Sequence, residues 1–199
     1  FSATGKHYRY TLLIAPDRTT LLDVFHWPAL PSGASIGRRK DGGLDWGLFE
    51  HPTPGAPNTG PVCSGWSSRP VIDIHGQIAT FSSSDGAELR YTLDGAEPDE
   101  HSPIYTTALK VDPGTVIRVR AFARDALPSA CAIYTCGIPA GALALTASPG
   151  DLEGANGIAD EASGNFARKG REWWRKAWMQ WGDGSGPEPE AVGIASAGS

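Results

Sequence analysis

The 199-residue chain lacks the features that mark several classes of function. Its three cysteines lie in no C-x-x-C or Cys/His spacing typical of zinc sites. No segment approaches the run of about 18 apolar residues that can span a membrane, so we expect no membrane span. Acidic residues outnumber basic ones by 22 to 17, which gives a net charge of −5 and no general reason to bind nucleic acid or an anionic membrane.

The usual catalytic motifs are missing as well. The five histidines are scattered without an H-E-x-x-H pair, and Ser67 in GWSSR does not fit the G-x-S-x-G nucleophile motif. The glycines of GDGSG at 182–186 lack the spacing and the lysine of a phosphate-binding loop. We therefore expect this segment to catalyse no reaction by itself and to hold no cofactor.

The pairing state of the cysteines is open. On one extended strand Cys131 and Cys136 would lie about 16 Å apart, beyond the reach of a disulfide, so they could pair only across a turn. Cys63 could pair with either of them, and three buried thiols is the simplest alternative.

The chain begins at Phe1 rather than at a methionine, and no basic start followed by an apolar run is present. We expect it to be a piece of a longer protein. In that case the lack of a leader says little against secretion.

Short strand-like segments with turn signals, and no helical period between them, predict an antiparallel β-sandwich. Residues 78–83 and 87–93 flank Ser84-Asp85-Gly86, whose turn chemistry predicts a hairpin. In 115–123 every second residue is apolar, so one face of this strand is expected in the core. The remaining expected strands are 8–14, 21–25 and 130–136.

The acidic stretch TLDGAEPDEHSPIY raises two alternatives. Asp94-Gly95 has the chemistry of a tight turn, and Pro98 and Pro103 prevent the connection from pairing as a strand. The functional alternative is a calcium site, because carboxylates are hard oxygen donors. Regular ligand spacing is missing, so we favour the turn. The candidate cation ligands are Asp94, Glu97, Asp99 and Glu100.

The segment REWWRKAWMQW also has two interpretations. Three of its tryptophans fall at i, i+4 and i+7, the stripe of an amphipathic helix. As a strand it would turn Ala177, Met179 and Trp181 inward, with Trp178 and Gln180 outward, and the period alone does not decide over so short a run. Exposed tryptophans can stack on sugar rings, so the candidate glycan-stacking residues are Trp173, Trp174, Trp178 and Trp181.

A strand ending Tyr-Thr-x-Asp-Gly-x-x-Pro, then Ser-Pro-x-Tyr, then a strand of the form Val-x-Ala-x-Ala-Phe resembles the chitobiase/β-hexosaminidase C-terminal domain, or fibronectin type III-associated domain. The resemblance covers residues 71–136 and implies a β-sandwich that serves as a non-catalytic accessory piece of bacterial secreted and surface proteins. The residues that carry it are Tyr91, Thr92, Asp94, Gly95, Pro98, Ser102, Pro103, Tyr105, Arg120, Ala121 and Phe122.

The flanking segments resemble two other families. Residues 1–58 are similar to the closing part of a bacterial lamin tail domain, an immunoglobulin-like sandwich, through Trp27, Pro28, Ser35, Gly37, Arg38, Trp46 and Pro52–Asn58. Residues 137–199 resemble the start of a CotH kinase-like domain, with Trp174 and Lys176 departing from that pattern. This resemblance favours the strand interpretation of REWWRKAWMQW. The carrying residues are Pro139, Leu143, Leu145, Asp151, Leu152, Gly157, Ile158, Arg171, Glu172, Trp173, Arg175 and Ala177.

Together these resemblances predict an all-β chain: immunoglobulin- and fibronectin-like antiparallel sandwiches in tandem, joined by a linker at 59–70 and followed by a truncated α+β segment. They imply accessory spacing and docking modules of an extracellular or cell-surface bacterial CotH-type protein. Its partners would be other domains of the same chain, with a surface polysaccharide or protein as a further candidate. Two alternatives are a carbohydrate-binding module, and part of a secreted kinase whose catalytic residues lie beyond Ser199.

Overall fold

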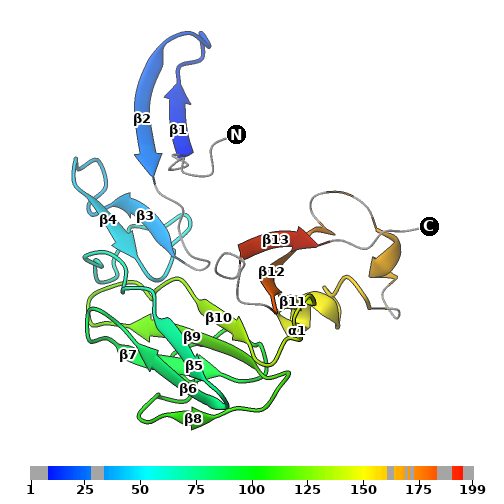
Figure 1. The fold of residues 1–199 in the computed structure, drawn as a ribbon. Coiled ribbons are helices and arrows are strands. Elements are labelled where there is room, and N and C mark those ends of the chain that lie inside the picture. The colour runs from blue at the N-terminus through cyan, green and yellow to red at the C-terminus, as the bar shows by residue number, and fades with distance from the viewer. Residues whose placement is uncertain are drawn as a thin grey trace. The chain divides into compact units, whose positions relative to one another are not determined.

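The computed structural model describes residues 9–27, 34–160, 164–168, 170, 173–182 and 190–194. The chain divides into two compact units, residues 1–65 with 125–127, and residues 66–124 with 128–199. Almost all regular structure in the described residues is antiparallel β-sheet (Figure 1), which confirms the expected fold class. None of the helices in these residues is long and apolar enough to cross a membrane.

The first unit contains two short antiparallel sheets of two strands each. β1 (Arg9–Ile14) pairs with β2 (Leu21–Trp27), and β3 (Ser35–Arg38) pairs with β4 (Trp46–Phe49). The rings of Phe25 on β2 and Trp46 on β4 are stacked, with centroids 3.6 Å apart. Asp23 and Arg38 form an ion pair of 2.9 Å between the same strands.

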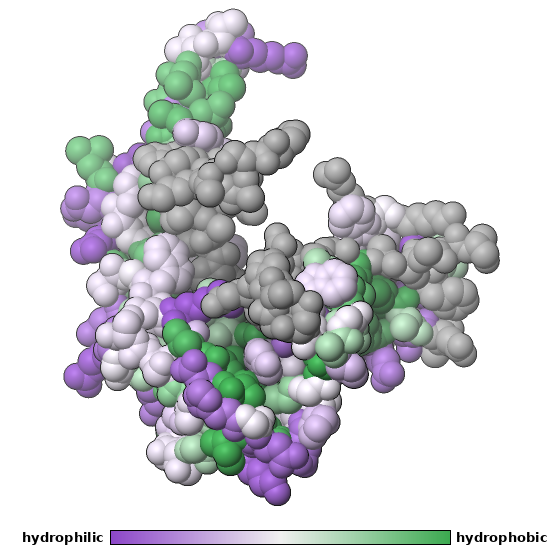
Figure 2. Space-filling view, in the orientation of Figure 1, coloured by the Kyte–Doolittle hydropathy of each residue, from purple (hydrophilic) through white to green (hydrophobic). Residues whose placement is uncertain are grey.

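The hairpin of β1 and β2 leaves large apolar side chains uncovered, and its apolar surface is visible in Figure 2. A two-stranded sheet is marginal in water unless another layer covers it. This hairpin therefore has little core of its own. The exposed residues are Tyr10, Leu12, Leu13, Ile14, Leu21, Leu22 and Val24.

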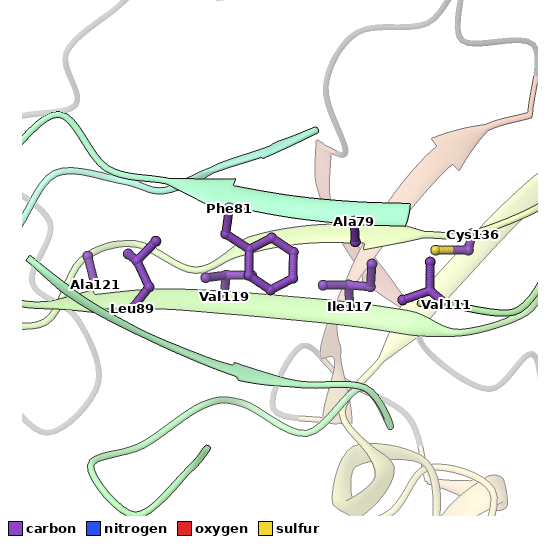
Figure 3. Packing of buried hydrophobic residues seen from close by; sticks show 8 residues of the cluster. All are labelled: Ala79, Phe81, Leu89, Val111, Ile117, Val119, Ala121 and Cys136. Atoms are coloured by element: carbon purple, nitrogen blue, oxygen red, sulfur yellow. The ribbon is translucent and has the colours of Figure 1, made fainter. Parts of the chain in front are cut away.

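The second unit begins with a β-sandwich of two three-stranded sheets. One sheet has the order β5-β6-β8 and consists of Val71–His75, Ile78–Ser82 and Leu109–Lys110. The other has the order β10-β9-β7 and consists of Ala132–Thr135, Val116–Phe122 and Glu88–Thr92. Their facing sides enclose a single apolar cluster (Figure 3): Ala79, Phe81, Leu89, Val111, Ile117, Val119, Ala121 and Cys136.

The central strand β9 follows the predicted alternation on its apolar face. Ile117, Val119 and Ala121 are each 0% exposed, and Figure 3 shows Phe81 and Ala79 pointing towards them from the facing sheet. This prediction is confirmed. The sequence pattern did not reveal that the opposite face of β9 is also covered, because it carries Arg118 and Arg120.

The predicted hairpin around Ser84-Asp85-Gly86 is wrong. β6 pairs with β5 and β8, whereas β7 pairs with β9, so this turn connects the two sheets of the sandwich. The hairpin instead lies one strand earlier, where Gly76 adopts a φ of 62° between the paired residues His75 and Ile78. Local turn chemistry marks where a strand ends, but it does not say which strand becomes the partner.

A third sheet follows the sandwich, with β12 (Arg175–Trp181) between β11 (Leu143–Ala147) and β13 (Glu190–Ile194). A single helical turn, α1 (Pro149–Leu152), and a 3-10 turn at Asn165–Ala167 connect β11 to β12. The strand interpretation of residues 175–181 is therefore confirmed.

The predicted facing of β12 is wrong in part. Ala177 is fully buried as expected, but Trp181 on the same face is 44% exposed. Trp178, which was expected to face outward, is 8% exposed. Ala177 and Trp178 lie on opposite faces of β12 and both are buried, so this part of the strand is covered on both sides. A prediction that assumes one buried and one exposed face cannot describe it.

Candidate functional site

The most specific polar geometry in the described residues lies between the sandwich and the third sheet. The side-chain amide of Gln180 on β12 binds the backbone of Thr135 on β10 twice. The Thr135 amide donates to Oε1 at 2.8 Å, and the Gln180 Nε2 donates to the Thr135 carbonyl at 3.1 Å. Nearby, the hydroxyls of Thr135 and Thr146 are 3.0 Å apart and share a hydrogen bond.

The position of Thr135 explains why this contact matters. β10 pairs with β9 on one side only, so it is the edge strand of its sheet. An edge strand presents backbone donors and acceptors that another strand can capture. The amide of Gln180 supplies one donor and one acceptor, as a pairing strand would, and it occupies this edge at Thr135.

Arg118 on β9 forms the second part of the same contact. Its side chain is fully buried, its Nη1 donates to Ser148 Oγ at 3.1 Å, and its guanidinium carbon lies 4.2 Å from the ring centroid of Trp178. Nε and Nη2 have no hydrogen-bond partner within the described part of the chain. Burial lowers the pKa of Arg118 below its usual value, because the charged form loses its hydration.

These contacts define what we call the sandwich–sheet interface. Trp178 and Gln180 lie two positions apart on β12, so both side chains leave the same face of the strand. The cation–π contact of a desolvated guanidinium with an indole is worth on the order of 2 kcal/mol. The interface consists of Arg118, Thr135, Thr146, Ser148, Trp178 and Gln180.

The acidic stretch forms a turn, and its carboxylates are used within it. Asp94 accepts from the amide of Ala96 at 2.9 Å, and Asp99 accepts from the amide of His101 at 3.0 Å. The hydroxyl of Ser102, and after it the amide of His101, hold the pKa of Asp99 below its usual value. Residues 93–105, which follow β7, therefore have the turn structure that the sequence favoured.

The other two candidate cation ligands face different partners. Glu97 lies 3.3 Å from Arg120, and Glu100 lies 3.5 Å from the exposed His101. In the part of the chain that the structure describes, no three His, Cys, Asp or Glu side chains are grouped as a metal site would require. The structure therefore gives the four carboxylates no common centre.

The residues of the chitobiase C-terminal motif pack in the core or shape the turns of the sandwich. Pro98 is fully buried, the amide of Tyr91 donates to the carbonyl of Pro103, and Tyr105 packs against the core, 4.6 Å from the ring of Phe81. Gly95 adopts a φ of 82°, a backbone conformation that favours glycine. At the end of β9, the ring of Phe122 lies beneath the guanidinium of Arg120.

The four candidate glycan-stacking tryptophans do not form one row. Trp178 is buried under Arg118, so it offers no open ring to a sugar. Trp173 is half-buried and in contact with the guanidinium groups of Arg168 and Arg175, whereas Trp174 and Trp181 are 54% and 44% exposed. Only the last two present open indole surface.

All three cysteines are free thiols in the structure. Burial raises the pKa of Cys131 to about 11, and it also raises the pKa values of Cys136 and Cys63. A protonated thiol is a poor nucleophile, so these cysteines lack the electrostatic setting of reactive ones.

The first unit contains an apolar cavity of about 430 Å³. Its size falls within the range of small-molecule sites, but its walls carry few groups that could orient a ligand. It lies under the face of the β1–β2 hairpin that bears Phe25, beside the stacked Trp46. The lining residues are Thr11, Leu13, Asp23, Phe25, Ala34, Ser35, Ile36 and Trp46.

The antiparallel sandwich has an apolar core between its two sheets and ordered turns. Residues 74–134 match the family model of the chitobiase/β-hexosaminidase C-terminal domain, a domain that is found in carbohydrate-active enzymes. This confirms the resemblance for the sandwich. No curated protein and no solved structure matches the chain, and the lamin tail and CotH resemblances lie outside the matched residues.

Proposed function

We propose that the chain is a non-catalytic accessory piece of a longer protein, in which the sandwich docks and orients the segment that follows it. The observation that carries this proposal is the sandwich–sheet interface. A flexible spacer needs no specific contact with its neighbour, whereas here Gln180 binds both backbone groups of Thr135 and Arg118 is buried against Trp178.

The chemistry of the interface supports orientation more than simple adhesion. Apolar surfaces can slide past one another, but two hydrogen bonds to one backbone position fix a single register. The cation–π contact of Arg118 with Trp178 exists only while the indole covers the guanidinium, so it favours one position of β12. Such an interface holds the third sheet in one position on the sandwich.

The surroundings of this module are part of the same proposal. We place it in an extracellular or cell-surface bacterial protein of the CotH type, with residues 1–58 as the closing part of a lamin tail domain and residues 137–199 as the start of the CotH domain. Its partners would be the other domains of that chain. The support is the sequence resemblance of the flanks.

Backbone relaxation of the full chain tests the orienting role. If the sandwich holds the third sheet, amides of β9 and β12 will report the same rotational correlation time. In a Trp178→Ala/Gln180→Ala double variant, the β12 amides will report faster local tumbling while those of β9 do not change. The control is Gln77→Ala, on an exposed side chain in the β5–β6 loop. A shorter correlation time for β12 in the unmodified chain would contradict the proposal.

A further inference from the structure

The β1–β2 hairpin of the first unit has two faces with different surroundings. The side chains of its inner face line the cavity of that unit, and they are Thr11, Leu13, Asp23 and Phe25. Leu12 pairs with Val24 across the hairpin, and directly paired residues share a face, so these two lie on the opposite side. Alternation along the two strands adds Tyr10 and Leu22 to them. We call these four residues the outer hairpin face.

The outer hairpin face is apolar and open to water. Tyr10, Leu12, Leu22 and Val24 are 65%, 53%, 59% and 50% exposed, and the apolar surface of the hairpin is visible in Figure 2. Side chains of this size, each about half exposed, together offer on the order of 500 Å². An apolar patch of this area on a soluble protein marks an interaction site.

None of the four side chains of the outer hairpin face is charged. Asp23, which lies within β2, belongs to the inner face, where its carboxylate is 2.9 Å from the guanidinium of Arg38. Two copies of the outer hairpin face can therefore meet without placing like charges together, which is a common penalty against association. The net charge of −5 does not oppose contact at this patch.

We propose that the outer hairpin face is the contact between two copies of this chain, packed face to face about a two-fold axis. The contact would remove roughly 1,000 Å² from water, the lower limit of a specific interface. It would also give each two-stranded hairpin the second layer that such a sheet needs in water. A two-fold contact uses the same patch on both copies and closes on itself, so it predicts dimers and no larger assemblies.

This inference goes beyond the orienting role proposed above and does not depend on it. The hairpin belongs to the first unit, whereas the sandwich–sheet interface lies in the second.

Sedimentation velocity of the full chain tests the contact, with a reducing agent present so that the free cysteines form no disulfide between copies. An interface near the lower size limit should give a dissociation constant on the order of 10 μM. The chain should therefore change from monomer to dimer between about 1 and 200 μM. Raising the salt from about 50 to 500 mM should not weaken the dimer, because the outer hairpin face carries no charge.

The double variant Leu12→Thr/Val24→Thr should raise the dissociation constant at least about tenfold, because it removes apolar surface from both copies. Threonine favours strands, so the hairpin should still form. The matched control is Leu13→Thr, which is on the same strand and 58% exposed but lies on the inner face. It should change the dissociation constant by no more than about twofold. A nuclear Overhauser effect between the stacked rings of Phe25 and Trp46 shows that each variant retains its hairpin.

Three results would overturn the proposal. The first is a chain that stays monomeric at about 200 μM, which would leave this face to a different partner. The second is an equal loss of affinity in Leu13→Thr, or no loss in the double variant and in Leu22→Thr, a further substitution on the outer hairpin face. The third is association that continues beyond dimers or weakens as the salt rises. None of these results affects the orienting role, whose test is the motion of β12.

Discussion

The side chain of Gln180 makes the same pair of hydrogen bonds with the backbone of Thr135 that a neighbouring strand would make. The backbone amide of Thr135 donates to Gln180 Oε1 at 2.8 Å, and Gln180 Nε2 donates back to the Thr135 carbonyl at 3.1 Å. Because β10 is an edge strand, this residue of the following sheet closes part of the sandwich. The end of the recognised domain is thereby tied to what comes after it.

Trp178 should contribute strongly to the free energy of unfolding, because its ring covers the buried guanidinium of Arg118. Trp178→Ala removes a buried indole and leaves the guanidinium without its ring contact, so we expect a loss of about 3–5 kcal/mol in the free energy of unfolding. Urea denaturation measures it. Arg118→Met is the informative companion, because replacing a buried charge by an apolar side chain of similar length is often neutral or stabilising. A smaller loss for Trp178→Ala than for Arg118→Met would contradict this account.

Gly137, directly after the buried Cys136, should not tolerate a side chain. It has a φ of 67°, and an added Cβ would lie 2.6 Å from the Cβ of Pro113. Gly137→Ala therefore combines backbone strain of about 1 kcal/mol or more with a clash. The control is Gly114→Ala, where φ is 87° but nothing lies within 4 Å of the added carbon. Thermal unfolding should show a clearly larger fall in melting temperature at Gly137, and equal falls would show that the clash is relieved without cost.

Stability should fall in acid partly through Asp85, in the connection between β6 and β7. Hydrogen bonds, first from the amide of Ser68 and then from the hydroxyl of Ser83, lower the pKa of Asp85 from 3.8 to about 2. Since the folded-state pKa lies below the unfolded one, this stabilisation is complete above about pH 4. It is lost as the pH falls through about 2.

The substitution that checks this is Asp85→Asn, which should flatten the dependence of melting temperature on pH between about 4 and 2. Asp41→Asn, on an exposed loop of the first unit, is the comparison. An unchanged slope in Asp85→Asn would show that the carboxylate has the same pKa in the folded and unfolded chains.

Much of the sandwich was predictable from the sequence, because its signals are local. The alternation in 115–123 placed Ile117, Val119 and Ala121 in the core, and the turn residues from Asp94 to Pro103 gave the connection after β7. The partner of β7 was not predictable, since Ser84-Asp85-Gly86 suits a link between sheets as well as a hairpin.

The interface was missed for a different reason. Arg118 lies on the charged face of an alternating strand, and such a face is normally solvated. Its burial depends on Trp178, which lies 60 residues further along the chain, and no period in either segment relates the two. The one available signal was a glutamine and a tryptophan on the same face of β12, and that pattern fits a solvated face equally well.

Protection from amide exchange should be uneven along the chain. β9 lies between two strands and has a buried face, so its amides should exchange most slowly. β1 and β2 should exchange fastest, because their hairpin exposes residues such as Leu12 and Val24. β11 and β12 should fall between, since they depend on their contact with the sandwich. Equal protection of β1 and β9 would refute this order.

The exchange rate of the Thr135 amide tests the central claim most directly. In the unmodified chain this proton is bound to the Gln180 side chain, and it should be protected although it lies on a sheet edge. In Gln180→Ala it should exchange at least about tenfold faster, while the β9 amides and the Gln77→Ala control remain unchanged. If the Thr135 amide exchanges equally fast with and without the Gln180 side chain, the sandwich does not hold the sheet that follows it.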